Sequence, residues 1–171
     1  SLIRPEATGY GVVYFTEQML KYKNNSLKGK KITISGSGNV AQYATEKCIE
    51  LGAKVITLSD SSGYIIDPDG IDKEKLAFIM DLKNIKRGRI ESYTKNYPKA
   101  SFNAGQTPWN VACDIALPCA TQNELNGNDA KILLNNGCIC IGEGANMPCT
   151  PEAIELFKMN QLLFAPGKAS N

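Results

Sequence analysis

A glycine-rich hexapeptide, Gly-Ser-Gly-Asn-Val-Ala at residues 36–41, follows a short apolar run and precedes a helical pattern. The first glycine of such a run permits a tight turn, the second lets a phosphate approach the backbone, and the alanine lets the helix pack close to the strand. The N–H groups at the start of the helix attract negative charge. The alternative is a simple strand-to-helix turn. The spacing predicts a pyrophosphate site on Gly36, Ser37, Gly38, Asn39 and Val40.

The second chemical signal is an acidic residue, Asp60, at the end of the next β-branched run, residues 54–59. A carboxylate in that position accepts hydrogen bonds from the ribose hydroxyls of an adenosine, which is typical of NAD sites. Taken alone, Asp60 therefore favours NAD as the cofactor.

Polar and cationic residues elsewhere favour the opposite choice. Ser61 follows the acid directly, and Lys83, Lys86 and Arg89 recur at every third position. On one continuous α-helix these cations would share a face, and such a cluster would bind the 2′-phosphate of NADP. The alternative is a solvated helix face whose cations interact with the helix dipole, and Gly88 weakens the helix at this point.

Two polar loops, residues 117–123 and 142–148, are interrupted by Gly and Pro and follow later apolar runs. Amide and hydroxyl side chains of such loops can hold a nicotinamide ring and its ribose, although structural loops share this composition. Trp109, which follows a proline, is interpreted as a packing anchor rather than a stacking platform.

Composition excludes several classes of chemistry. The chain has no histidine, so a histidine base, a Ser-His-Asp triad and a His-containing metal site are impossible within it. Six cysteines form neither a CxxC pair nor paired zinc knuckles, so we expect buried thiols, no metal and a reducing, cytoplasmic compartment. A net charge of +2 favours neither nucleic acid nor a membrane surface as a partner, and no apolar run is long enough to span a bilayer.

The apolar periodicity predicts the elements that would position these residues. Strands are expected near 31–35, 54–59, 114–117, 138–141 and 162–164. Helices are expected near 7–23, 39–51, 72–87, 128–134 and 151–158. This alternation is typical of an α/β fold with a doubly wound parallel sheet (Rossmann-like), whose ligand crevice lies at the carboxyl ends of the strands. We expect residues 1–171 to form a single dinucleotide-binding domain.

Six motifs resemble one family across essentially the whole chain. They are RPEATGYG (4–11), GSGNVAQYA (36–44), SDSSG (59–63), DIALPCATQNEL (114–125), GEGANMP (142–148) and FAPGKASN (164–171). Together they resemble the hexameric glutamate dehydrogenases, in particular the NADP-dependent branch of microbes and protists. The resemblance implies an oxidoreductase that interconverts L-glutamate with 2-oxoglutarate and ammonia and assembles as a homo-hexamer.

The same resemblance implies roles for individual residues. Asn39 and Val40 would contact the phosphates and ribose of the cofactor. The residues that would surround a 2′-phosphate are Asp60, Ser61, Lys83, Lys86 and Arg89, a match that favours NADP. The residues that would hold the nicotinamide end are Thr8, Ala120, Thr121, Asn146 and Asn171. Arg4 would lie near the α-carboxylate of the substrate.

The resemblance also implies that the chemistry lies elsewhere. The catalytic lysine and aspartate of the family belong to a preceding domain, and this chain, which begins at Ser1 without a methionine, is expected to be part of a longer protein. We expect it to bind the cofactor without turnover. Two alternatives stay open: the cofactor domain of a related amino-acid dehydrogenase, and a stand-alone nucleotide-binding or sensing module.

Overall fold

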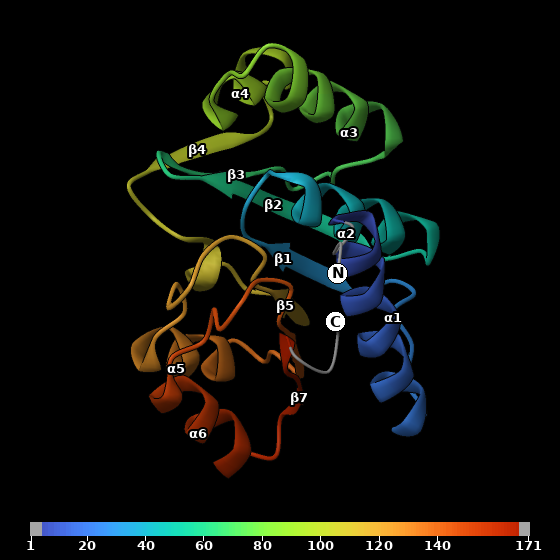
Figure 1. Cartoon of the computed structure of the whole chain (residues 1–171), viewed down its shortest axis with the longest axis vertical. Helices are drawn as coiled ribbons and strands as arrows, with labels where there is room; N and C mark the ends of the chain where they lie inside the picture. The colour runs from blue at the N-terminus through green and yellow to red at the C-terminus, as the bar shows by residue number, and fades with distance from the viewer. Residues whose placement is uncertain (1–4, 168–171) are drawn as a thin grey trace.

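In the computed structural model, which describes residues 5–167, one sheet lies between two groups of helices (Figure 1). The strands are β1 (Lys31–Ile34), β2 (Lys54–Asp60), β3 (Gly63–Ile66), β4 (Ser101–Ala104), β5 (Ile115–Leu117), β6 (Cys140–Gly142) and β7 (Leu163–Ala165). The α-helices are α1 (Pro5–Tyr22), α2 (Asn39–Glu50), α3 (Lys73–Met80), α4 (Tyr93–Asn96), α5 (Gly127–Asn135) and α6 (Pro151–Met159). A π-helical turn, Asp81–Ile85, follows α3, and 3₁₀ turns form at Ile90–Ser92 and Pro108–Asn110. Within residues 5–167 no helix combines the length and apolarity needed to cross a bilayer.

The strands lie in the order β4-β3-β2-β1-β5-β6-β7. All five strands expected from the sequence are present, each within two residues of its expected bounds. They pair in parallel, β1 with both β2 and β5, β5 with β6, and β6 with β7. The α/β class and the parallel centre of the sheet are therefore confirmed.

The expectation of a sheet that is parallel throughout is wrong at one edge. β3 is antiparallel to β2, and β4 is antiparallel to β3. Gly63 begins β3 with φ +148°, and a Cβ there would lie 2.2 Å from the carbonyl oxygen of Asn103, so only glycine fits. β4 is a partly exposed edge strand with the sequence Ser-Phe-Asn-Ala, which carries a single large apolar side chain and so gives only a weak strand signal.

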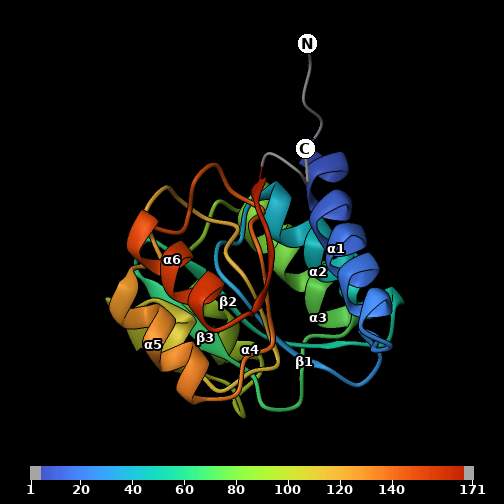
Figure 2. The same ribbon diagram turned by 90° about the horizontal axis from the view of Figure 1, so that it is seen from below.

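Alternation along the central strands supplies a core to each face of the sheet. On β5, Ile115 and Leu117 pack into the cluster under α1, α2 and α3, whereas Ala116 joins the cluster under α5 and α6. Cys140 and Ile141 of β6 divide between the two clusters in the same way. Figure 2 shows α1 and α2 on one side of the strands and α5 and α6 on the other. The strand period thus explains why helices cover both faces.

Cysteines and the single tryptophan fill these cores. All six cysteines are buried and unpaired, as expected. Trp109 is completely buried, and its Nε1 donates to the carbonyl oxygen of Glu124 at 3.2 Å. The interpretation of Trp109 as a packing anchor is confirmed.

Candidate functional site

A cavity of about 630 Å³ opens at the carboxyl edge of the sheet, where β1, β2 and β5 end. β1 lies between β2 and β5 in the sheet. After β1 the chain continues into α2 on one face, and after β5 it continues to α5 on the other face, so a crevice forms between the two strand ends. Eleven residues predicted from the sequence line it: Gly36, Ser37, Gly38, Asn39, Val40, Asp60, Ser61, Lys83, Arg89, Ala120 and Thr121.

The glycine turn between β1 and α2 forms one wall. Gly36 has φ +87°, and a Cβ there would lie 2.9 Å from the carbonyl oxygen of Cys119, so glycine is required. Its N–H donates to Ser59 Oγ at 2.7 Å, which ties the turn to β2. Gly38 is the N-cap of α2, and a Cβ built on it would meet nothing within 4 Å. The backbone of Gly38 therefore borders open space at a helix N-terminus.

The Asp60 carboxylate, predicted to accept ribose hydroxyls, already accepts hydrogen bonds from this chain. Its Oδ1 accepts from the N–H (2.9 Å) and the hydroxyl of Ser62. Its Oδ2 accepts from the N–H of Ile90 at 2.7 Å and from Lys83 Nζ at 3.1 Å. Burial alone would raise the pKa of Asp60, but these hydrogen bonds outweigh it and lower the pKa to about 2. Asp60 is thus an ionised anchor at this end of the cavity.

The helix predicted at 72–87 is interrupted. A π-helical turn, Asp81–Ile85, follows α3, and the N–H of Lys86 donates to the carbonyl oxygen of Asp81 at 3.0 Å, the wide i to i+5 pattern. The continuous helix that a shared cationic face required is therefore absent, because the helical turns end at Ile85 and Arg89 lies in extended backbone.

Two of the three cations line the cavity. Lys83 lies against the Asp60 carboxylate. Arg89 Nη2 donates to Ser61 Oγ at 2.6 Å, and the Arg89 side chain is 54% exposed. Lys86 is not among the lining residues; its Nζ lies 3.3 Å from Asp81 Oδ2, and its side chain is 67% exposed. The positive charge at this end of the cavity therefore comes from Lys83 and Arg89.

Ala120 and Thr121 line the wall that follows β5. Their N–H groups donate to Glu124 Oε2 at 2.9 and 3.0 Å. Burial raises the pKa of Glu124, against the lowering effect of these hydrogen bonds. Glu124 therefore fixes the loop whose backbone borders the cavity.

Two other predicted residues do not line the cavity, and two more fall outside residues 5–167. Thr8 is buried in α1, and Asn146 is exposed in the loop after β6; neither lines the cavity. Arg4 and Asn171 lie outside the described residues.

Sequence reasoning missed several lining residues, namely Ser59, Gly105, Gln106, Thr107, Cys119 and Glu124. Three of them, Ser59, Cys119 and Glu124, stand inside motifs whose neighbours were singled out, so their position near strand ends was a usable signal. The segment 105–107 follows β4, and without that strand nothing in the sequence placed the segment at the cavity.

The cavity combines a helix N-terminus with two cations, an arrangement that suits a ligand bearing phosphate groups. Its two carboxylates, Asp60 and Glu124, are both engaged by donors of the chain. Within residues 5–167 no group of three His, Cys, Asp or Glu side chains is placed to hold a metal ion.

Comparisons with known proteins agree across the whole chain. The family model described as glutamate/leucine/phenylalanine/valine dehydrogenase matches residues 1–171. A glutamate dehydrogenase of Bacteroides thetaiotaomicron is 62% identical, an NADP-specific one of Escherichia coli 56%, and an NAD-specific one of Bacteroides fragilis 54%. Each match covers 100% of this chain and 38% of the relative. The crystal structure of Plasmodium falciparum glutamate dehydrogenase superimposes with a TM-score of 0.95 at 48% identity, over 99% of this chain and 36% of that one.

Proposed function

Because the chain belongs to the glutamate dehydrogenases of the glutamate/leucine/phenylalanine/valine dehydrogenase family, we propose that residues 1–171 form the NADP-binding domain of such an enzyme. In this proposal the domain is a single, doubly wound, Rossmann-like unit. The whole protein interconverts L-glutamate with 2-oxoglutarate and ammonia, as a hexamer in the cytoplasm. The observation that carries the proposal is the cavity in which the glycine turn meets Lys83 and Arg89.

The lining residues fit a dinucleotide. At about 630 Å³ the cavity falls within the usual range for cofactor sites. The open space at Gly38 lets a pyrophosphate approach the backbone, and the N-terminus of α2 attracts its charge. Ser61, Lys83 and Arg89 supply a hydroxyl and two cations for a further phosphate.

The state of Asp60 supports NADP rather than NAD. Its oxygens accept four hydrogen bonds from the chain, so little capacity is left for ribose hydroxyls. Its charge is balanced by Lys83 and Arg89, which lie 3.1 and 3.3 Å away and still border the cavity. Relatives of similar identity carry both NADP-specific and NAD-specific names, so the choice depends on this local arrangement.

We assign the proton transfers to another part of the whole protein. When bound, NADP supplies the nicotinamide ring that accepts a hydride. Removing a proton from an amine needs a free base near the reacting carbon. In the described part of the chain, the carboxylates and the lysine that line the cavity, Asp60, Glu124 and Lys83, are all engaged in hydrogen bonds, and burial raises the pKa of the Cys119 thiol well above its ordinary value. The chain by itself therefore binds without turnover.

A matched pair of variants tests the coenzyme assignment. Arg89→Ala and Lys86→Ala each remove one positive charge, but only Arg89 lines the cavity. A charge-assisted hydrogen bond contributes about 1.5–3 kcal/mol, so calorimetric titration should show Arg89→Ala binding NADP about tenfold or more weakly, with NAD little changed. Lys86→Ala should bind both coenzymes like the wild type. Equal losses for NADP and NAD, or equal effects of the two variants, would contradict the assignment.

A further inference from the structure

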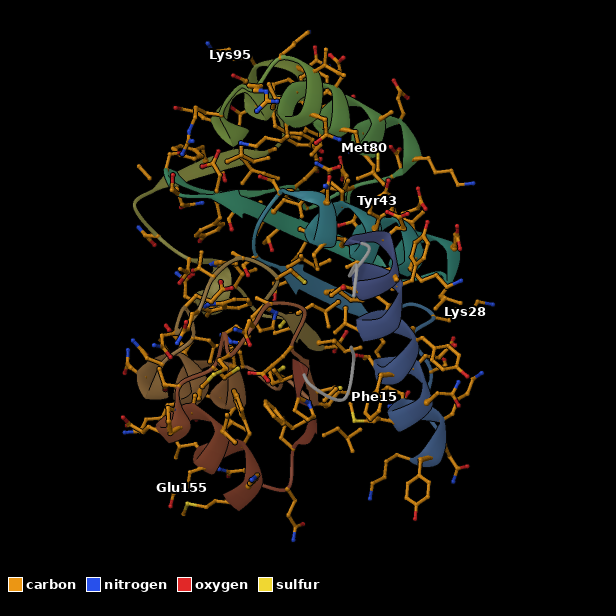
Figure 3. All side chains as sticks on the ribbon, viewed as in Figure 1. Phe15, Lys28, Tyr43, Met80, Lys95 and Glu155 are labelled. Carbon is orange, nitrogen blue, oxygen red and sulfur yellow. The ribbon has the colours of Figure 1, made fainter. Side chains whose placement is uncertain are left out.

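A reciprocal amide pair joins α2 to the π-helical turn. Gln42 Nε2 donates to Asn84 Oδ1 at 2.9 Å, and Asn84 Nδ2 donates to Gln42 Oε1 at 3.0 Å. Gln42 is 1% exposed, whereas Asn84 lies at the surface. Figure 3 labels Tyr43 on α2 and Met80 at the end of α3, two helices that contact each other.

The pair connects two parts of the cavity wall without lining the cavity itself. On one side Gln42 Nε2 also donates to the carbonyl oxygen of Ser37, in the centre of the glycine turn. On the other side Asn84 is the neighbour of Lys83, whose Nζ contacts Asp60 at 3.1 Å. Hydrogen bonds therefore run without a break from Ser37 of the glycine turn, through Gln42, to Asn84, the residue next to the cavity lysine.

The π-helical turn is held by several contacts besides this pair. The N–H of Asp81 still donates to Ala77 as in an α-helix, whereas the N–H of Lys86 donates to Asp81 in the wider pattern. Leu82 is buried, and Lys83 Nζ also donates to the carbonyl oxygen of Gly88 at 2.9 Å. The two hydrogen bonds between Asn84 and Gln42 are the side-chain hydrogen bonds that join this turn directly to α2 among the described residues.

We propose that Gln42 and Asn84 are positioning residues that hold Lys83 at a fixed place relative to the glycine turn, and so contribute to the preference for a 2′-phosphorylated dinucleotide. This inference rests on the proposed function. Asn84 acts through Lys83, and Gln42 acts on both ends of the cavity. Replacing Asn84 therefore affects the 2′-phosphate end of the cavity and leaves the hydrogen bond from Gln42 to the glycine turn in place.

A double-mutant cycle on the 171-residue chain tests this positioning. Lys83→Met keeps the aliphatic stem and removes the charge, and Asn84→Ala removes the surface partner of the pair. Dissociation constants for NADP, NAD and 2′,5′-ADP are measured by calorimetry for the wild type, both single variants and the double variant. A neutral hydrogen bond is worth about 1 kcal/mol, so Asn84→Ala should weaken NADP and 2′,5′-ADP about fivefold in the wild-type background. In the Lys83→Met background, and for NAD in either background, Asn84→Ala should change affinity less than about twofold.

Controls separate the possible failures. Asn135→Ala, on an exposed position of α5, should change none of the three affinities. An equal loss for NAD and NADP, or an undiminished loss in the Lys83→Met background, would overturn the positioning role. If the wild-type chain binds neither coenzyme, the proposed function is overturned. If the wild-type chain binds NADP and the Asn84→Ala variant binds it equally well, only this inference is overturned. If the Ala variant does not fold, Asn84→Ser replaces it in the same cycle.

Discussion

Replacing Asp60 by Asn removes a buried charge that organises one end of the cavity. The Asp60 side chain is 8% exposed, and its pKa of about 2 lies below the ordinary value of 3.8. That difference corresponds to about 2 kcal/mol of preference for the ionised form in the folded chain. We therefore expect Asp60→Asn to lower the free energy of unfolding by about 2 kcal/mol at neutral pH.

The loss of stability expected for Asp60→Asn depends on pH. Because folding lowers the pKa, the stabilisation is fully present above the pKa of the unfolded carboxyl, near 4, and is lost as the pH falls through about 2. The difference between wild type and variant should shrink to about half at pH 3. Urea unfolding measures this difference at each pH, with the fluorescence of Trp109, the single tryptophan and a buried one, as the signal.

Asp81→Asn is the matched control. Asp81 is 51% exposed and pairs only with the exposed Lys86 among the described ion pairs, so its replacement should cost less than about 0.5 kcal/mol at any pH. The reasoning about Asp60 is refuted if Asp60→Asn is as stable as the wild type at neutral pH. It is equally refuted if the stability difference is the same at pH 7 and pH 3.

The remaining predictions concern the glycine turn and turnover. Gly38→Ala should lower the free energy of unfolding by less than about 1 kcal/mol, because alanine is a poorer N-cap but its Cβ meets open space, yet weaken NADP and NAD together in calorimetry. Gly36→Ala should destabilise the chain in urea by more than about 1 kcal/mol, because of its positive φ and its contact with Cys119. An absorbance assay of the chain with glutamate and NADP should show no reduced coenzyme. Formation of reduced coenzyme that is abolished by Gly38→Glu would contradict this expectation.

Local patterns predicted the centre of the fold. The strand 31–34 and its glycine turn are specified by neighbouring residues, since β-branched runs and Gly36 impose their conformation with little help from distant contacts. By contrast, β4 is a short edge strand whose pairing with β3 brings Asn103 close to Gly63. Its position, and with it the cavity segment 105–107, depends on pairing across the chain.

The cations show a second limit of sequence reasoning. Spacing would place Lys83, Lys86 and Arg89 on one face of a continuous helix, but the helical turns end at Ile85, where the distant Gln42 binds Asn84 of the last turn. The role of Asp60 was likewise hidden, because two of its donors, Lys83 and Ile90, are distant in sequence and reach it only in the folded chain. Hydrogen-bond saturation of a carboxylate is a tertiary property that no local pattern records.

Amide chemical-shift mapping tests the central claim most directly, because it locates a ligand on the chain residue by residue. Titration of the ¹⁵N-labelled chain with NADP should give saturable shifts at residues 36–40, 59–61 and 120–121 and at Lys83 and Arg89, the residues around the cavity. Shifts that cluster instead in the groove of about 400 Å³ between α2 and α3, lined by Glu46 and Leu76, would contradict the account. The absence of any saturable shift would contradict it as well.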